Sequence, residues 1–549
     1  MADIQKLLQV FTERGPFNKT SEKLVSLSTG LVAEESVNAA DAQSVGENIL
    51  TSMVGHSVAE YKFSQKNQVK TLASAVHAKT ASGERIEMDP QRLYQRLLVT
   101  GICDIPVTDL MKYELCSFPT SLFNNHMCMR TGDKAELIHH LLKLVPECVV
   151  STTLDKGLQF IVDGGALLHK FLWPKHSSYA EICAMYVRHV RSTYGCALVV
   201  FDGYHGSTTK DEAHRRRTGS DIGASVSVSA EMRLTMSKKA FLANTSNKQA
   251  LINLLAEDMV KADITVEHAE GDADYKICML ACLSAKNSQT AVVAEDSDVF
   301  QLMIHHADAT DNSDNLYMVT AKQTVCITTL KKKLDPALSE SLLFLHAFSG
   351  CDTTSRPYGI GKVTVFTKYA ALSKSATVFM SPSSSKQDIK QAGEDAMLEI
   401  YGCTTSLSLN AARVTKFLLK VATSTQYVSP EKLPPTSDAA TFHSHRTYHQ
   451  VQGWRGNDIA SAVWGWKATP GGLVPIRMTQ PAAPERLLKI IRCNCGGQCD
   501  KKTCTCRKNG LQCTPACGQC RGITCMNVPH VDNQDDDDQD VDLNNNTMD

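Results

Sequence analysis

Acidic residues at the ends of apolar runs are the first feature of this sequence that could do chemistry. The runs LQFIVDGG, CALVVFDGY and TAVVAEDSD end at Asp163, at Asp202, and at Asp296 with Asp298. Each run has the composition of a buried parallel strand. In open α/β sheets, sites assemble at the carboxyl edge of such strands. We therefore expect these carboxylates to gather at one edge of a sheet.

Three further acids extend the set to seven. Asp272 and Asp274 lie where a loop enters the helical pattern of AEGDADYKICMLACL, and Asp352 follows the apolar segment LLFLHAFSG. Each acid alone has a structural alternative, because Asp often caps a helix N-terminus and favours its positive end. Together, gathered carboxylates repel and need a compensating cation. Mg²⁺ or Mn²⁺ suits oxygen ligands, and two such ions stabilise the attacking and leaving oxygens in phosphodiester hydrolysis.

Basic residues and a glycine turn fit the same chemistry. In KDEAHRRR, Lys210, Arg215 and Arg216 fall on a predicted helix after the second apolar run, although Arg217 could replace Arg216. A solvated basic helix face is the alternative for each of them. The turn formed by Gly359, Ile360, Gly361 and Lys362 precedes a helical pattern and presents backbone N–H groups, which favour an anion.

Five segments, in this order, resemble the motifs of the flap-endonuclease family with its PIN-like fold: FIVDGGALLHKF, VVFDGYHGSTTKDEAHRRR, EGDADYKI, VVAEDSDVF and SGCDTTSRPYGIGKVTVF. The resemblance covers roughly residues 156–425 and implies a two-metal site built from the seven acids. It also implies a helical arch whose Lys and Arg clamp the scissile phosphate, and a helix–turn–helix that grips the DNA backbone through the GIG turn.

The chain departs from the family at one position of this pattern. GDAD stands where the family usually has Glu, so Asp272 and Asp274 are each one methylene shorter. Because Mg²⁺ geometry is strict, this shortening bears on activity. Glu295, beside Asp296, has no assigned role.

A cysteine-rich module forms the second chemical feature. Nine of the 20 cysteines fall between Cys493 and Cys525, among few large hydrophobic residues. Zn²⁺ with thiolates can replace a missing apolar core, and the odd count argues against a disulfide framework. Nine thiolates close three tetrahedral zinc sites if three sulfurs bridge. The predicted ligands are Cys493, Cys495, Cys499, Cys504, Cys506, Cys513, Cys517, Cys520 and Cys525.

The cysteine spacing resembles the tesmin-type CXC domain, a DNA-binding zinc module. With three Zn²⁺ and nine thiolates, residues 486–525 keep a charge of about +4, which suits phosphate contacts. Family members often place Tyr just before the fourth Cys, where this chain has basic residues that suit a narrow minor groove instead. The candidate DNA contacts are Lys501, Lys502, Arg507 and Lys508. A structural or protein-binding zinc knot is the alternative.

The elements that must position these residues divide the 549-residue chain into several parts. We expect a helical N-terminal region of unknown role at 1–150. A PIN-like, three-layer α/β/α domain with a parallel sheet should occupy 151–430. The remaining parts are a linker with a Trp-rich segment and little regular structure at 431–486, the small zinc-knot module at 487–528, and an acidic disordered tail at 529–549.

Composition limits the classes of function. No apolar run approaches 18 residues and the start lacks a signal-peptide pattern, so no membrane partner and a reducing compartment are expected. The tail from residue 531 holds eight Asp and no Lys or Arg, which leaves about +7 on the rest of the chain. This asymmetry favours a DNA partner and hence a nuclear location.

The leading hypothesis is a metal-dependent, structure-specific DNA nuclease tethered to DNA by the zinc module. A catalytically inactive DNA- or chromatin-binding protein that keeps the nuclease fold as a scaffold is the alternative, and an origin in mobile DNA is a third possibility. Seven mutually repelling carboxylates favour the enzyme, whereas the shortened pair Asp272 and Asp274 favours the scaffold. DNA against RNA, and endo- against exo-cleavage, stay open.

Overall fold

The structure is a computed structural model. It describes residues 105–150, 157–203, 209–210, 223–310, 314–423 and 428–484 with single-residue or two-residue gaps at 117, 125 and 470–471, and parts of 493–527. Before residue 105 it describes 4–5, 8, 41–56, 61, 76–79 and 85–88. The chain forms two compact units, one of residues 1–107 with 414–429 and one of residues 108–413 with 430–549.

The first unit contains helix α2 (Ala42–Met53) and an antiparallel hairpin of β1 (Val76–Lys79) and β2 (Arg85–Met88). The sequence predicted mostly helix in this region and missed the hairpin. Helix α18 (Leu409–Thr423) begins in the second unit and ends in the first.

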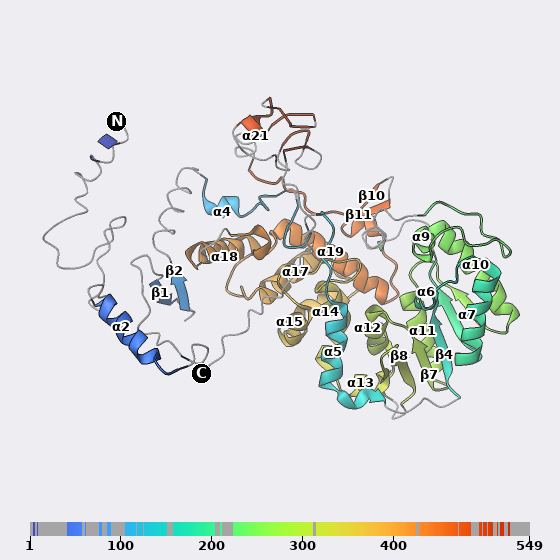
Figure 1. The fold of residues 1–549 in the computed structure, drawn as a ribbon. Helices are drawn as coiled ribbons and strands as arrows, with labels where there is room; N and C mark the ends of the chain where they lie inside the picture. Colours follow the sequence, from blue (N-terminus) through green and yellow to red (C-terminus); the bar gives the residue numbers. More distant parts are fainter. Residues whose placement is uncertain are drawn as a thin grey trace. The chain divides into compact units, whose positions relative to one another are not determined.

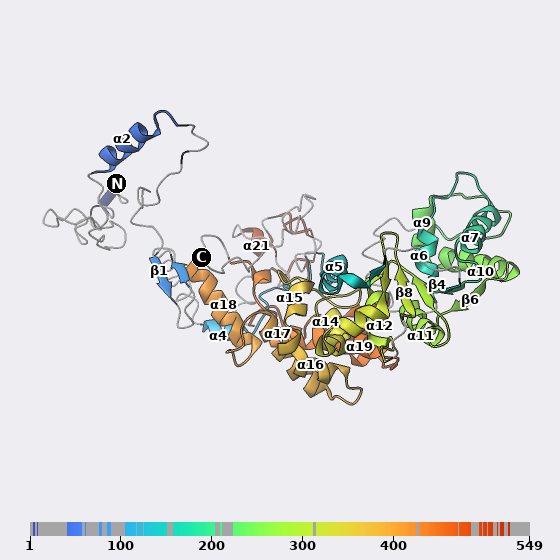
Figure 2. The same cartoon turned by 90° about the horizontal axis from the view of Figure 1, so that it is seen from below.

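A seven-stranded sheet organises the second unit, in the order β3-β9-β8-β7-β4-β5-β6 (Figures 1 and 2). Five neighbouring strands, β8-β7-β4-β5-β6, are parallel, and β9 and β3 continue the sheet antiparallel. The strands are β3 (Val149–Val150), β4 (Gln159–Asp163), β5 (Leu198–Phe201), β6 (Thr265–His268), β7 (Thr290–Val293), β8 (Leu316–Val319) and β9 (Thr324–Cys326).

The winding of the sheet reverses between β4 and β7. The chain runs from β4 outward to β5 and β6, then returns to place β7 on the other side of β4, followed by β8. In open α/β sheets the crevice at such a reversal, beyond the carboxyl ends of the strands, is where sites form. Asp163 ends β4, and Asp296 follows β7 by three residues.

Helices cover both faces of the sheet, because alternate strand residues point to opposite sides. Ile161 and Val292 belong to the core shared with α11, α12 and α14, whereas Val162 and Phe201 belong to the core shared with α6, α7 and α10. The predicted three-layer α/β/α class is thus confirmed. The covering helices are α6 (Gly164–His169), α7 (Tyr179–Tyr194), α9 (Lys238–Ala243), α10 (Thr245–Lys261), α11 (Ala273–Ala285), α12 (Ser297–His306), α13 (Ile327–Lys333) and α14 (Pro336–Phe348).

A bundle of further helices extends α14. It comprises α15 (Lys362–Thr367), α16 (Tyr369–Met380), α17 (Lys386–Ile400) and α19 (Ser437–Trp454). Local sequence signals begin several helices. Ser178 and Glu181 form a capping box at the start of α7, and Ser385 and Asp388 form another at the start of α17.

The predicted boundary at residue 150 differs from the structure, which includes residues from 108 onward in the second unit. Phe123 and the inward face of α5 (Lys134–Leu144), with Leu137 and Leu141, are fully buried in the main core. Glu114 pairs with Arg413 at 3.5 Å, and both side chains are 1% exposed. The helical pattern of KAELIHHLLKLV was recognised in the sequence, but its packing partner was not.

Residues 431–486 are also more regular than predicted. Helix α19 spans 18 residues, and β10 (Trp466–Thr469) pairs with β11 (Gly472–Pro475). The sequence of α19 is polar, yet its polar side chains are buried because they have backbone partners: His443 Nε2 bonds to the Phe348 carbonyl at 3.1 Å, and Gln452 donates to the Phe379 carbonyl at 2.8 Å. The expectation that the Trp residues pack on something is confirmed by Trp454 and Trp466, which are buried.

Among the helices that the structure describes, none is both long and apolar enough to cross a membrane.

Candidate metal centre

Two of the strand-end acids organise the switch point of the sheet. Asp163 caps α6, where its Oδ1 accepts hydrogen bonds from the amides of Gly165 (2.8 Å) and Ala166 (3.2 Å). Asp202, after β5, accepts through Oδ1 from the amide of Ala273 at 3.0 Å, the first residue of α11. The carboxylate of Asp202 therefore joins the end of one strand to the start of the helix that carries Asp274.

The two Asp pairs repeat one local geometry. Asp272 caps α11 and accepts from the amide of Asp274 at 3.5 Å, and Asp296 caps α12 and accepts from the amide of Asp298 at 2.9 Å. The N-cap interpretation is thus correct for Asp272 and Asp296. The same caps bring the second acid of each pair inward: one carboxylate oxygen from each of Asp274, Asp296 and Asp298 lies within 4.8 Å of the others.

The electrostatics confirm that the carboxylates compete for charge. Burial, followed by the charges of Asp202 and Asp296, raises the pKa of Asp163 to about 6. Burial and the neighbouring Asp272 also raise the pKa of Asp274 well above its usual value. Such an arrangement is costly for anions alone, and a nearby cation relieves the repulsion.

Lys210 already supplies one positive charge to this group. Its Nζ lies 2.7 Å from Oδ2 of Asp272 and 2.7 Å from Oδ2 of Asp274. Burial alone would lower the pKa of this ammonium, but the surrounding carboxylates hold the pKa well above its usual value. Lys210 therefore lies at the predicted site, paired with acids. Arg215, Arg216 and the alternative Arg217 lie outside the residues that the structure describes.

A second lysine at the site was not predicted. Lys248 of α10 is buried, and burial lowers its pKa while the charges of Asp202 and Asp163 oppose this change. Its segment, TSNKQALINLL, has ordinary helical composition, so the sequence offers no sign of this position. Only the packing of α10 against the sheet places the ammonium beside the acids.

Asp298 and Asp352 complete the acidic set. Asp298 is 1% exposed, and its Oδ1 lies 2.8 Å from Nε2 of His346 on α14. Asp352 is buried in the turn after α14. Its neighbour Cys351 has a thiol pKa raised first by burial and then by the charge of Asp298. The turn that holds Asp352 therefore lies near Asp298.

The predicted DNA contact at Lys362 is wrong in this structure. The Lys362 side chain is 1% exposed, and its Nζ donates to the His346 carbonyl at 2.9 Å and to Ser349 Oγ at 3.1 Å. A lysine held inside the fold does not reach a phosphate. Gly359 is exposed, with a φ of 69° that favours glycine, and Gly361 directly precedes α15.

The donor set matches a hard divalent cation. All the inward groups of the acidic set are carboxylates, and carboxylate oxygens are the ligands that Mg²⁺ and Mn²⁺ prefer. The three converging oxygens and the raised pKa of Asp163 both call for positive charge at this edge of the sheet. The acids therefore fit the predicted metal by chemistry and by placement.

The cysteine module forms a separate thiol cluster. Eight of its nine cysteines are buried, and Cys495 is half-buried. The Sγ of Cys493 lies 3.9 Å from that of Cys499, 3.8 Å from Cys513 and 3.6 Å from Cys520. Tetrahedral zinc with Zn–S bonds of about 2.3 Å requires sulfurs about 3.8 Å apart.

The thiols form overlapping groups of four, as bridging requires. Cys493 belongs to three such groups, and Cys499, Cys504 and Cys513 each belong to two. Of the predicted DNA contacts, Lys501 and Arg507 are exposed, Lys508 ends the short helix α21 (Thr505–Lys508), and Lys502 lies outside the described residues.

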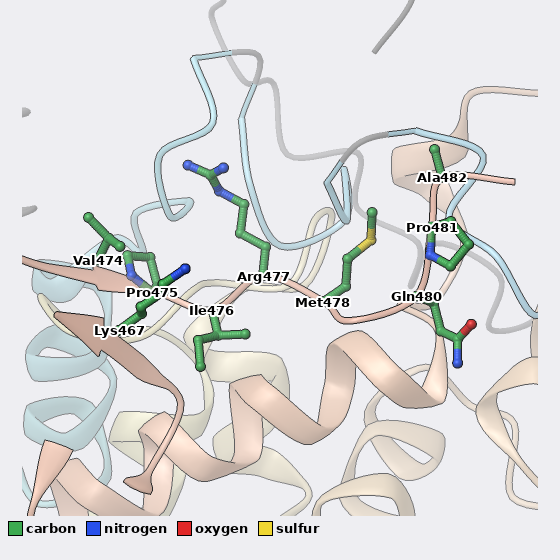
Figure 3. A pocket seen from close by; sticks show the side chains of 9 residues that line it. All are labelled: Lys467, Val474, Pro475, Ile476, Arg477, Met478, Gln480, Pro481 and Ala482. Carbon is green, nitrogen blue, oxygen red and sulfur yellow. The ribbon is translucent and has the colours of Figure 1, made fainter. Parts of the chain in front are cut away.

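A shallow pocket of about 460 Å³ lies elsewhere, along β11 and the segment after it (Figure 3). Its lining runs from Lys467 to Ala482 and includes none of the predicted site residues. Arg477 points away from α19, and its guanidinium donates to the Met127 carbonyl at 3.2 Å. The pocket therefore adds no group to the acidic site.

Comparison with known proteins adds limited information. A family model described as a domain of unknown function (DUF8702) matches residues 1–114. No curated protein matches the chain. Among solved structures, the catalytic core of Rad2 in complex with DNA substrate aligns with 51% of this chain and 77% of its own, at 16% identity and a TM-score of 0.30. The T5 D15 protein co-crystallized with metal ions aligns with 48% of this chain and 95% of its own, at 13% identity and a TM-score of 0.29.

Proposed function

We propose that this protein is a metal-dependent nuclease that hydrolyses phosphodiester bonds in branched or flapped DNA. The observation that carries the proposal is the convergence of Asp274, Asp296 and Asp298 at the carboxyl edge of a parallel sheet, beside its switch point. The ordered resemblance of five segments to flap-endonuclease motifs supports the same reaction.

The acids divide into two groups that would hold divalent ions. Asp163 and Asp202 lie near one another at the ends of β4 and β5, and Asp272, Asp274, Asp296 and Asp298 gather at the starts of α11 and α12. Asp352 adds a buried carboxyl close by. Two Mg²⁺ or Mn²⁺ ions bound there would supply Lewis acidity and a nucleophile from water at neutral pH.

The two lysines at the site would act on the charge of the substrate. Lys210 reaches the acids from the segment that the sequence assigns to a phosphate clamp, and its flexible stem allows the ammonium to exchange a carboxylate for a phosphate oxygen. Lys248 would hold a fixed positive charge beside Asp163 and Asp202. Both ammonium groups would favour the approach of a phosphodiester.

The cysteine module would bind three Zn²⁺ and attach the enzyme to DNA. The sulfur spacings of 3.6 to 3.9 Å around Cys493 support tetrahedral thiolate sites. Lys501 and Arg507, both exposed, would contact phosphates, and the resemblance to a tesmin-type CXC domain supports this role. A nuclear location follows from DNA as the partner.

One observation favours the scaffold alternative. Lys210 neutralises Asp272 and Asp274 with two contacts of 2.7 Å, and these are the two acids shortened relative to the family. An internal ion pair of this kind would replace a metal in a protein that binds DNA without cutting it.

Cleavage of a labelled 5′-flap duplex by the full chain tests the proposal. The parent should cut in Mg²⁺ or Mn²⁺ and not in EDTA, and Asp296→Asn, which keeps a capping oxygen for α12, should lose cutting. Asp308→Asn, an exposed acid after the same helix, is the matched control and should cut like the parent. A folded parent that binds the duplex but does not cut it in either metal would favour the scaffold.

A further inference from the structure

A buried chain of polar contacts runs from the metal centre into the protein. Asp298 Oδ1 lies 2.8 Å from His346 Nε2, and His346 Nδ1 lies 3.2 Å from Lys362 Nζ. The exposed fractions are 1% for Asp298, 0% for His346 and 1% for Lys362. All three groups are therefore removed from water, and each depends on the others for its polar partners.

The contacts fix the tautomer of the imidazole. A lysine ammonium has three donors and no acceptor, and two of the Lys362 donors serve the His346 carbonyl and Ser349 Oγ. The contact to Nδ1 therefore requires an unprotonated Nδ1 that accepts. In the neutral ring the hydrogen then lies on Nε2, which donates to the carboxylate of Asp298.

Neighbouring segments hold the pair in place. The imidazole of His346 stacks on Trp454 of α19, with ring centroids 5.4 Å apart and planes 24° apart. Gly132, just before α5, approaches so closely that a Cβ there would lie 3.2 Å from Lys362 Cε and 3.2 Å from the Gly350 carbonyl oxygen. The two segments that sequence analysis placed outside the nuclease domain thus enclose this pair.

We propose that His346 and Lys362 are positioning residues that orient the Asp298 carboxylate for the metal. The inference rests on the proposed function, in which Asp298 is a metal ligand. A fixed Nε2–H on Oδ1 directs Oδ2 of Asp298 as the free ligand atom and limits rotation of the carboxylate. Outer partners of this kind commonly change metal affinity by roughly 10- to 100-fold.

Mn²⁺ binding by the full chain, measured at fixed pH by electron paramagnetic resonance, tests this role. His346→Leu and Lys362→Met should each weaken Mn²⁺ binding by roughly 10- to 100-fold. His346→Gln, whose Nε2 can still donate to Asp298, should recover most of the affinity. His139→Gln, at an exposed histidine of α5, is the control and should bind like the parent.

A second measurement does not depend on the stability of the variants. In ¹⁵N-histidine NMR of the metal-free parent, the His346 signals, assigned by their absence in His346→Gln, should show a protonated Nε2 and an unprotonated Nδ1. A protonated Nδ1 with a bare Nε2 would overturn the inference. Unchanged Mn²⁺ affinity in folded His346→Leu would overturn it while leaving the proposed function intact, whereas a parent that binds no Mn²⁺ would overturn both.

Discussion

The buried histidine His443 should make the second unit sensitive to mild acid. Its ring lies on α19 against Phe348, fully buried, with Nε2 bonded to the Phe348 carbonyl at 3.1 Å. Burial, and then the charge of Arg446, lowers its pKa to about 3. The ring therefore stays neutral in the folded protein at pH values where it gains a proton in the unfolded chain.

The magnitude follows from the two pKa values. With about 6.5 for the unfolded chain, stability from this group is unaffected above that pH and falls by about 1.4 kcal/mol for each pH unit below it. At pH 5.0 the folded ring is still neutral, because its pKa of about 3 lies well below. The loss relative to pH 7.5 is then about 2 kcal/mol from His443 alone.

Urea unfolding at pH 7.5 and 5.0, followed by tryptophan fluorescence, measures this loss because Trp454 and Trp466 are buried in the same unit. His443→Gln keeps a donor for the Phe348 carbonyl and removes the titration, so its stability should fall by about 2 kcal/mol less than that of the parent. The exposed control His139→Gln should fall like the parent. Equal losses in His443→Gln and the parent would refute the reasoning and the placement of α19 in the core.

Three further predictions concern the parts of the chain. Glu114→Gln removes one charge of a buried pair and leaves Arg413 enclosed, so the free energy of unfolding in urea should fall by about 3 kcal/mol, whereas Asp109→Asn, in an exposed pair with Lys112, should change nothing measurable. Residues 151–430 alone should fail to fold because they lack α5 and α19, and residues 105–484 should give a cooperative melt by circular dichroism; a stable shorter fragment would contradict the core described here. Metal analysis should find about three Zn²⁺ per chain, and their removal should expose residues 493–527 to protease while the tryptophan signal persists; a zinc-free protein with a protected module would contradict the cluster.

The sequence predicted the catalytic edge of the fold well because its signal is local. An apolar run followed by Asp defines both a buried strand and its end, and Asp163, Asp202 and Asp296 lie where this pattern places them. The parallel, three-layer arrangement follows from the same alternation of runs. The cysteine spacing was equally informative, since thiols crowded in a short segment have few other uses.

The remaining features depend on contacts between distant segments. Helix α19 was read as a linker because its inward side carries His443, Ser444 and Arg446 rather than apolar residues, and their partners lie on other elements. Lys362 was read as a DNA contact because a GIG turn usually points outward, whereas here the side chain turns inward to His346. Lys248 reaches the acids only through the packing of α10.

The capping role of the acids has a consequence for how such a protein could change over time. Asp163, Asp272 and Asp296 each use one oxygen to accept backbone amides at the start of α6, α11 or α12, and asparagine can do the same. A change from Asp to Asn therefore removes the ligand charge and keeps the helix start. A lineage could lose cutting in single steps that leave its folding untouched, so Asn at these three positions is the sign by which an inactive relative would be recognised.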